Sequence, residues 1–240
     1  MDAVDLSKPV DWNCPRYALI VGAGSALQNL DRLRKLVEGA DLVVCADGGF
    51  EALEAVDCLP DVFLGDLDST RIVSENPHLI QEYKEFGRLF TFPVRKDKTD
   101  MELAFDLLQE HGVRQGKVIG ALGTRLDHSL CNIFFLPVYL QRGVQLSLIT
   151  DTGEIRYLGP GNYRLPETDA ASYTSFLANP LPVTLSLKGF DYELSHRMLV
   201  PGSSLCVSNH VLTAENCLEI EGVPGSGCYY IVSSDKEPSF

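Results

Sequence analysis

The chain has 240 residues, 45% of them hydrophobic and 22% charged, which is enough apolar material for one large domain or two modest ones. The formal net charge of −13 disfavours general binding to nucleic acid or to an anionic membrane, and it suits a substrate that carries positive charge. The first residues, Met1 to Arg16, lack the apolar core of a secretion signal, and no apolar run approaches the ~20 residues that span a bilayer. Seven scattered cysteines without a Cys-x-x-Cys pair predict reduced, buried thiols, so we expect a cytoplasmic protein.

The first two thirds of the chain alternate short apolar runs with helical patterns. Strands are expected over residues 17–21, 42–46, 62–65, 89–92, 117–122 and 145–150. Helices are expected over residues 27–37, 50–56, 78–86, 99–111 and 129–141. Such alternation at short spacing predicts a parallel sheet covered by helices on both faces, a three-layer α/β domain.

After residue 152 the helical period disappears. Short alternating runs are separated by Gly, Pro, Asn and Asp, which is typical of a small all-β sandwich or barrel, and we expect the sandwich. The runs are 154–158, 161–165, 183–188, 204–207, 217–220 and 228–232. The predicted domains are therefore 1–152 (α/β) and 153–240 (β-sandwich).

Acidic motifs lie just past four of the predicted strands. They are Asp47-Gly48-Gly49, Gly65-Asp66-Leu67-Asp68-Ser69, Lys96-Asp97-Lys98-Thr99-Asp100 and Gly123-Thr124-Arg125-Leu126-Asp127. In a parallel sheet these carboxylates meet at one edge, where ligands bind. Crowded carboxylates need a cation, and Mg2+ binds through carboxylates together with substrate phosphates. Asp66 and Asp68 point the same way in extended chain and are the best candidates to hold the metal.

Neighbouring residues suit phosphate binding. Lys96 and Lys98 offset the carboxylate repulsion and could reach phosphate oxygens. Thr99 with Glu102 fits a helix capping box. Arg125 can fork onto a phosphate.

A helix after Asp127 would carry His128 and Asn132 on one face, because they are four residues apart. Two weaker patterns remain. Gly22-x-Gly24 with Asp47 as a ribose acid suggests a dinucleotide site, but Leu27 stands where the third glycine should be, which favours a plain strand-to-helix turn. Asp66-Leu67-Asp68-Ser69-Thr70 also matches the D-x-D-x-T pattern of aspartyl-phosphate phosphatases, although that motif normally follows the first strand of its sheet.

Taken together and in this order, the motifs resemble the thiamine pyrophosphokinase family in its bacterial form. The segments 187–192 and Ser208-Asn209 resemble that family's second domain. The resemblance implies transfer of a pyrophosphoryl group from ATP to the hydroxyl of thiamine, giving thiamine diphosphate and AMP. It also implies a homodimer with active sites at the subunit boundary.

The resemblance further implies roles for particular residues. Asp66, Asp68 and Asp100 are expected to be catalytic, with Asp100 accepting or orienting the thiamine hydroxyl proton, and Asp66, Asp68, Asp97 and Asp100 are expected to hold Mg2+. Nucleotide or phosphate contacts are expected from Asp47, Gly48, Gly49, Ser69, Lys96, Asp97, Thr99, Arg125, Asp127, His128 and Asn132. Ser208 and Asn209 of the partner subunit are expected to lie by the thiamine pyrimidine. His210, where many bacterial relatives carry an acid, puts only the contacts next to Asn209 in doubt.

Two other functions are compatible with parts of the sequence. A metal-dependent phosphohydrolase would use Asp66 as a nucleophile and release inorganic phosphate without thiamine. A non-catalytic nucleotide-binding protein would bind ATP and Mg2+ without turnover, but simple binding does not need so many acids.

Overall fold

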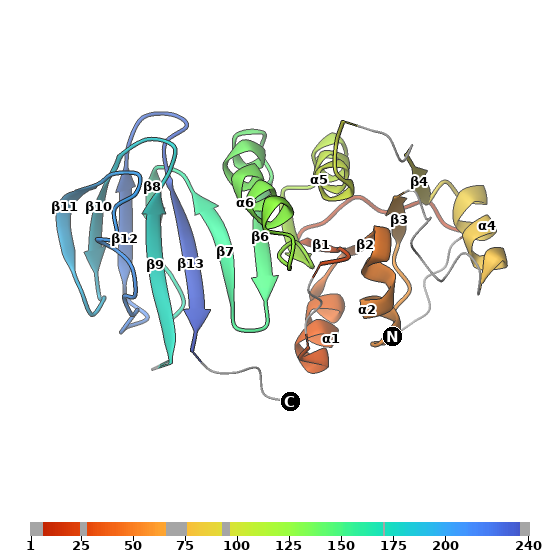
Figure 1. Cartoon of the computed structure of the whole chain (residues 1–240), viewed down its shortest axis with the longest axis horizontal. Helices are drawn as coiled ribbons and strands as arrows, with labels where there is room; N and C mark the ends of the chain where they lie inside the picture. Colours follow the sequence, from red (N-terminus) through yellow and green to blue (C-terminus); the bar gives the residue numbers. More distant parts are fainter. Residues whose placement is uncertain (1–6, 25–27, 66–75, 93–96, 170, 236–240) are drawn as a thin grey trace. The chain divides into compact units, whose positions relative to one another are not determined.

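The computed structural model describes residues 7–24, 28–65, 76–92, 97–169 and 171–235 (Figure 1). Contacts divide the chain into two compact units, one of residues 1–135 with 142–151 and the other of residues 136–141 with 152–239. Within the described part of the chain, each helix is too short or too polar to cross a bilayer. All seven cysteines are free, and Cys45, Cys58, Cys206 and Cys228 are buried.

The first unit is built on a parallel sheet. Its strands are β1 (Ala18–Val21), β2 (Leu42–Ala46), β3 (Val62–Gly65), β4 (Leu89–Thr91), β5 (Gln115–Ile119) and β6 (Gln145–Thr150). They lie in the order β4-β3-β2-β1-β5-β6, and every neighbouring pair is parallel. The predicted parallel α/β sheet is confirmed.

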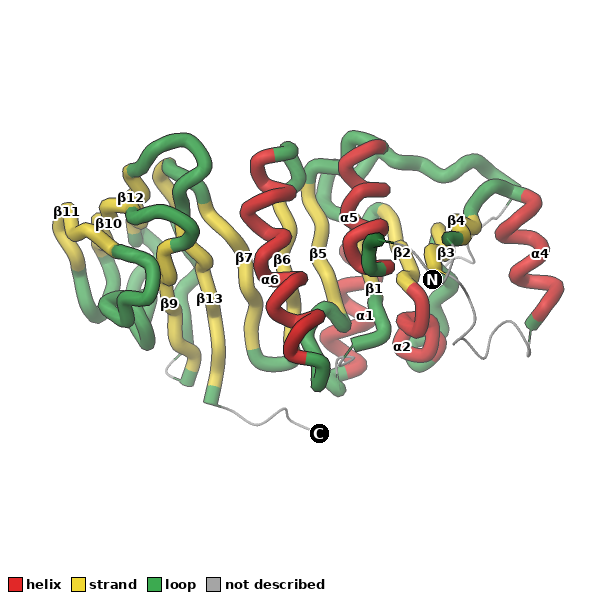
Figure 2. Tube along the Cα trace, turned by 45° about the horizontal axis from the view of Figure 1, so that its top comes forward, coloured by secondary structure: helices red, strands yellow, loops and turns green. Residues whose placement is uncertain are grey.

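Helices cover both faces of this sheet, as predicted (Figure 2). They are α1 (Leu30–Gly39), the 3-10 turn η1 (Asp47–Gly49), α2 (Phe50–Glu54), α4 (Pro77–Glu85), α5 (Asp100–Glu110) and α6 (Leu126–Gln141). Alternate strand residues such as Leu19, Val43 and Phe63 share a core with α1, α2 and α4. On the other face α5 packs on β2 and β3, and Phe105 contacts Phe135 of α6 edge-on, with 6.1 Å between ring centroids.

Local chemistry explains where two helices begin and end. Thr99 is the N-cap of α5, and its hydroxyl accepts the backbone N–H of Glu102 at 3.2 Å, as the sequence predicted. Gly112 ends the helix with φ of 73°. The prediction for α6 was wrong at its start, because the helix begins at Leu126 instead of Ser129. Asp127 and His128 therefore lie in its first turn.

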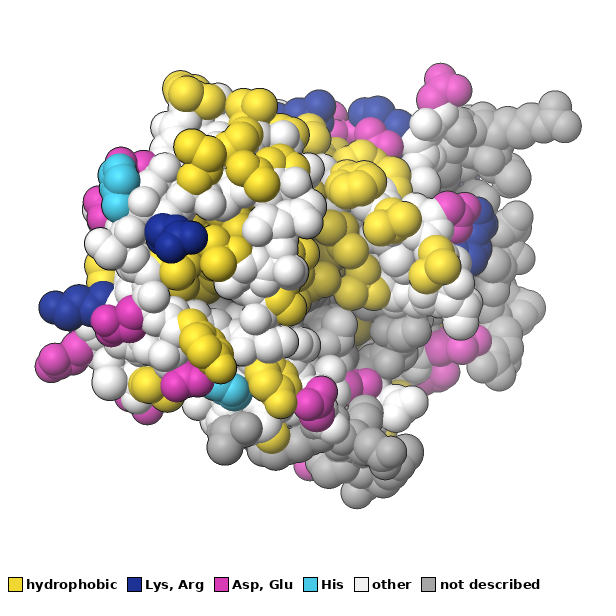
Figure 3. Space-filling model, turned by 60° about the vertical axis from the view of Figure 1, so that its left-hand side comes forward, with side chains coloured by type: hydrophobic (Ala, Val, Ile, Leu, Met, Phe, Trp, Pro, Cys, Tyr) yellow, Lys and Arg dark blue, Asp and Glu magenta, His cyan; other side chains and the backbone are white. Residues whose placement is uncertain are grey.

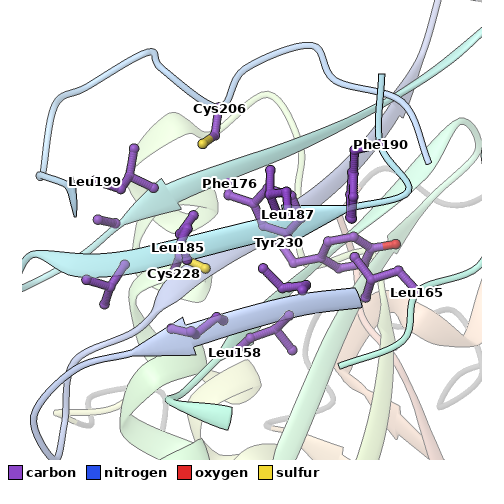
Figure 4. Packing of buried hydrophobic residues seen from close by; sticks show 14 of the residues in the cluster. Leu158, Leu165, Phe176, Leu185, Leu187, Phe190, Leu199, Cys206, Cys228 and Tyr230 are labelled. Atoms are coloured by element: carbon purple, nitrogen blue, oxygen red, sulfur yellow. The ribbon is translucent and has the colours of Figure 1, made fainter. Parts of the chain in front are cut away.

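The second unit is the predicted antiparallel β-sandwich. Its strands are β7 (Gly153–Leu158), β8 (Gly161–Tyr163), β9 (Ser172–Ala178), β10 (Val183–Lys188), β11 (Leu194–Leu199), β12 (Cys217–Glu221) and β13 (Cys228–Ser234). They form the groups β7-β13-β9 and β11-β10-β12-β8. Both groups contribute to one apolar core, in which Phe176 contacts Tyr230 with ring centroids 5.9 Å apart (Figure 4).

Two strands of this unit were missed, and one predicted strand is absent. β9 and β11 were not predicted, whereas residues 204–207 form a turn that buries Cys206. The turn runs close to β9, because the backbone N–H of Phe176 donates to the carbonyl of Cys206 at 2.9 Å. The second unit is a sandwich even though residues 204–207 form no strand.

Candidate active site

The order of the strands creates a crevice beside β1. From β1 the chain adds β2, β3 and β4 on one side and β5 and β6 on the other, so the strand order reverses between β1 and β5. Ligands of open α/β sheets bind at this switch point, outside the carboxyl ends of the strands. A cavity of about 620 Å³ lies there, within the usual range for ligand sites. Its walls are Gly22–Gly24, Ala46, Asp47, Thr99–Met101, Gly120–Arg125, His128, Ser129 and Asn132.

Glycines join the two loops that flank the switch point. The backbone N–H of Gly22 donates to Ile119 O and that of Gly24 to Gly120 O, both at 2.9 Å. A Cβ on Gly24 would lie 2.1 Å from the carbonyl oxygen of Gly120, so only glycine allows this approach. Gly22-x-Gly24 thus acts as a tight turn in the cavity wall, which favours the turn over the dinucleotide interpretation.

Asp47 enters the cavity from the end of β2 with an unusual backbone. Its φ is 49°, a left-handed conformation that costs free energy for a residue with a side chain. Gly48 and Gly49 follow in η1, and a Cβ on Gly49 would lie 2.0 Å from Val21 O. These two glycines therefore pack against β1 and its loop and are not part of the cavity wall. Gly65, the last described residue of β3, lies against Asp47.

The amino terminus of α5 supplies a second carboxylate. Thr99 and Asp100 line the cavity, whereas Asp97 is exposed and is not part of the lining. The first turn of a helix carries a partial positive charge. This end of α5 therefore stabilises the carboxylate of Asp100, and it would also stabilise a bound anion. Asp66, Asp68, Ser69 and Lys96 lie outside the described residues.

Helix α6 supplies the third wall and braces the loop that precedes it. The hydroxyl of Ser129 accepts the backbone N–H of Gly123 at 3.0 Å. The side-chain amide of Asn132, only 5% exposed, donates to Ala121 O at 2.6 Å. His128 and Asn132 share the cavity face of α6, which agrees with their spacing. The bracing role of Ser129 was missed, since a serine there was interpreted as a helix start.

Arg125 lies at the rim of the cavity and is held by a neighbour. Its Nη2 lies 2.6 Å from Oδ2 of Asp127, and both side chains are about two thirds exposed, 67% and 65%. The hydrogen bond from Arg125 lowers the pKa of Asp127 to about 2. Asp127 does not line the cavity, so its contact here is with Arg125.

In the second unit, Ser208 and Asn209 differ in exposure and in hydrogen bonding. Ser208 is exposed with φ of 60°. Asn209 is 2% exposed, and its side chain accepts the backbone N–H of Tyr192 at 2.9 Å and donates to the carbonyl of Tyr192 at 2.8 Å. Asn209 therefore joins two loops and holds the segment that presents Ser208.

The described residues offer oxygen ligands but no complete metal cluster. Among them, no group of three or more His, Cys, Asp or Glu side chains is close enough to hold an ion. Asp47 and Asp100 line the same cavity, and carboxylate oxygens are the donors that Mg2+ prefers. The donor set of the cavity therefore fits a hard cation in its chemistry.

The fold and the cavity define an α/β protein with a ligand-sized cavity at its switch point, joined to a β-sandwich. Residues 33–148 match the family described as thiamin pyrophosphokinase, catalytic domain, and residues 162–221 match thiamin pyrophosphokinase, vitamin B1 binding domain. The chain therefore belongs to the thiamine pyrophosphokinase family, as its motifs indicated, and this membership supports thiamine diphosphokinase activity.

Individual relatives agree over most of their length. The thiamine pyrophosphokinase of Bacillus subtilis (strain 168) is 30% identical over 172 residues, which is 71% of this chain and 78% of the relative. Thiamine pyrophosphokinase 2 of Oryza sativa subsp. japonica is 27% identical, over 86% of this chain and 83% of the relative. The crystal structures from Bacillus subtilis and Geobacillus thermodenitrificans match with TM-scores of 0.75 and 0.72, at 25% and 28% identity, covering 92% and 93% of this chain and 100% of each of theirs.

Proposed function

We propose that this chain transfers the β,γ-pyrophosphoryl group of ATP to the hydroxyl oxygen of thiamine, giving thiamine diphosphate and AMP. The observation that carries the proposal is the cavity at the switch point, in which Asp47, Asp100 and Arg125 meet the amino termini of α5 and α6. Transfer of this kind depends on positioning and on charge stabilisation more than on covalent chemistry. An acidic protein also suits the cationic thiamine ring.

The triphosphate binds along the wall formed by the two helix amino termini. Backbone N–H groups there and the positive ends of the helices favour phosphate oxygens. Arg125 leaves Asp127 and forks onto a phosphate, and His128, Asn132 and Thr99 border the same space. Ser69, Lys96, Gly48 and Gly49 remain predicted nucleotide contacts, the glycines through the backbone of η1.

Mg2+ is the proposed metal, held by Asp66, Asp68, Asp97 and Asp100 with Asp47 nearby. When bound it neutralises charge on the transferring oxygens. Asp100 orients the thiamine hydroxyl and accepts its proton as the oxygen attacks the β-phosphorus, since it lies on the cavity wall at the start of a rigid helix. AMP then leaves.

Thiamine binds between subunits of a homodimer in this proposal. Ser208 of the second copy contacts the pyrimidine, and Asn209 acts by holding the Ser208 segment against Tyr192. The region 162–221, which matches a vitamin B1 binding domain, includes both residues.

An exposed apolar stripe on α6 supports the homodimer. Leu126, Leu130 and Phe134 lie on one helix face at a spacing of four and are 74%, 52% and 55% exposed. Hydrophobic side chains are exposed at several places on the face that Figure 3 presents. Large exposed apolar patches mark association sites. Leu130 lies one residue from Ser129 and two from His128, both of which line the cavity, so a second copy seated on the stripe would border the cavity.

We place the enzyme in the cytoplasm, without nucleic-acid or membrane partners. Seven free cysteines suit a reducing compartment, and a net charge of −13 repels polyanions.

The decisive experiment is to incubate the protein with thiamine, Mg2+ and ATP and to identify the nucleotide product. Equal amounts of AMP and thiamine diphosphate are expected. ADP as the product would reject pyrophosphoryl transfer, and inorganic phosphate released without thiamine would favour a phosphohydrolase. Binding of ATP without any product would favour a nucleotide-binding protein.

A further inference from the structure

Lys98, in the middle of the predicted phosphate-binding motif, does not line the cavity. Its Nζ lies 2.5 Å from Oδ2 of Asp106 and 3.9 Å from Oε1 of Glu102. Residues 98, 102 and 106 are spaced by four, so Lys98 lies along one face of α5 above two carboxylates. The ammonium group is thus directed down the helix and away from the cavity wall that Thr99 and Asp100 form.

Successive side chains of an extended segment point to opposite sides. Thr99 is extended, with φ of −72° and ψ of 159°, and it lines the cavity. Holding Lys98 on the outer face of α5 therefore directs its neighbour Thr99 inward. Asp100 follows Thr99 as the first residue of the helix, so its direction depends on the same backbone.

Asp106 is itself held in place from a second element. Its Oδ1 lies 3.4 Å from Nη1 of Arg142, in the turn between α6 and β6. The Asp106 side chain is 14% exposed, whereas Lys98 is 46% exposed and Arg142 47%. The carboxylate is thus a mostly buried acceptor that lies between two cations.

We propose that Asp106 is a positioning residue, which holds Lys98 against α5 and so fixes the 97–100 segment with Thr99 and Asp100 directed into the cavity. The inference rests on the proposed function, in which the 97–100 segment binds Mg-ATP. Without the contact, the 97–100 segment is no longer held with Thr99 and Asp100 directed into the cavity. The loss should therefore appear in Mg-ATP binding.

The test compares Asp106→Asn and Lys98→Met with the wild type. Each variant is expected to raise KM for Mg-ATP about fivefold, the effect of one modest ion pair, and also to lower kcat, because Asp100 lies on the segment that loses its support. The double variant should show no further rise, because both substitutions remove one contact. Asp106→Glu, which keeps the charge, should recover most of the affinity. Calorimetric titration with Mg-ATP gives the same comparison without turnover.

The matched control is Glu110→Gln, which removes a carboxylate from an exposed position of the same helix, one turn further on. It should leave KM unchanged. The proposal is overturned if Asp106→Asn and Lys98→Met match this control, or if their effects on KM add. A wild type that binds Mg-ATP but makes no thiamine diphosphate would contradict the proposed function, and the calorimetric comparison would still decide the role of Asp106.

Discussion

The close approach of the Gly22 backbone restricts position 120 to glycine. Gly120 has φ of 71°, and a Cβ there would lie 2.2 Å from Gly22 O. Gly120→Ala should therefore separate the loops after β1 and β5, destabilise the protein by ~3 kcal/mol and weaken ATP binding. Urea unfolding and nucleotide titration measure the two effects.

Gly143→Ala is the control for this substitution. Gly143 has a similar φ of 91°, but nothing lies within 4 Å of an added Cβ. It should cost only the left-handed penalty of ~1–2 kcal/mol and leave ATP binding intact. Equal losses in the two variants would show that the close approach of the loops has no energetic weight.

Asp100 should matter for chemistry and little for folding. Asp100→Asn keeps the size of the side chain and removes the proposed proton acceptor, so kcat should fall by about a hundredfold or more. Loss of a charge at the helix start should cost less than ~1 kcal/mol of stability. Steady-state kinetics and thermal unfolding test both. Retained turnover together with a large loss of stability would indicate a capping role alone.

The Arg125–Asp127 pair gives a prediction about pH. Because the pair lowers the pKa of Asp127 to about 2, its contribution to stability is present above the ordinary carboxyl pKa of about 3.9 and is lost as the pH falls toward 2. Carbon NMR of the carboxyl should place the midpoint near 2, and Arg125→Gln should return it to the ordinary value. Bound ATP should have the same effect as Arg125→Gln, if Arg125 moves to phosphate. An unchanged midpoint with ATP would contradict that movement.

Among the helices and strands, those whose sequence signal lies within a few neighbouring residues were predicted correctly, and the others were not. The start of α5 was predicted because Thr99 and Glu102 carry the capping signal within four residues. The start of α6 was predicted three residues too late, at Ser129, whose hydroxyl accepts the backbone N–H of Gly123. β11 was missed because four of its six residues are exposed, which removes the alternation that marks a strand.

The site was predictable where topology alone brings residues together. Asp47, Asp100, Arg125, His128 and Asn132 meet because parallel strands end at one edge. The sequence did not predict where the side chains of Lys98 and Asp127 point, because their ion-pair partners determine it. The partner of Lys98 is Asp106, two helical turns away. The hydrogen bond between Asn209 and Tyr192 was also not predicted, because the sequence does not distinguish a structural, buried asparagine from one that contacts a ligand.

The apolar stripe on α6 gives the prediction at this scale. Phe134→Glu places a charge on the apolar stripe of the proposed subunit contact and should convert a dimer into a monomer, measured by light scattering after gel filtration. Thiamine turnover should fall while ATP binding persists, since the cavity belongs to one subunit. Gln141→Glu adds the same charge at an exposed position of the same helix and should change neither property. A wild type that is already monomeric would remove the dimer from the proposal.

For the whole molecule, the two compact units have separate apolar cores, and each core contains buried thiols. Cys45 and Cys58 belong to the core of the first unit, and Cys206 and Cys228 to that of the second. Burial raises the pKa of Cys58 and of Cys206 to about 11, so these thiols react slowly until their unit unfolds. Thiol alkylation therefore reports the unfolding of each unit separately.

We predict that the cores of the proposed domains 1–152 and 153–240 unfold separately. Phe176→Ala should cost ~3–5 kcal/mol in the β-sandwich, because Phe176 is fully buried against Phe190 and Tyr230. Pulse alkylation in urea followed by peptide mass analysis should show Cys206 and Cys228 reacting at lower urea, with Cys45 still protected. Leu53→Ala, at a fully buried site of the first core, should reverse the order. If all the buried thiols shift together in both variants, the chain unfolds as one cooperative unit and the proposed boundary does not separate folding domains.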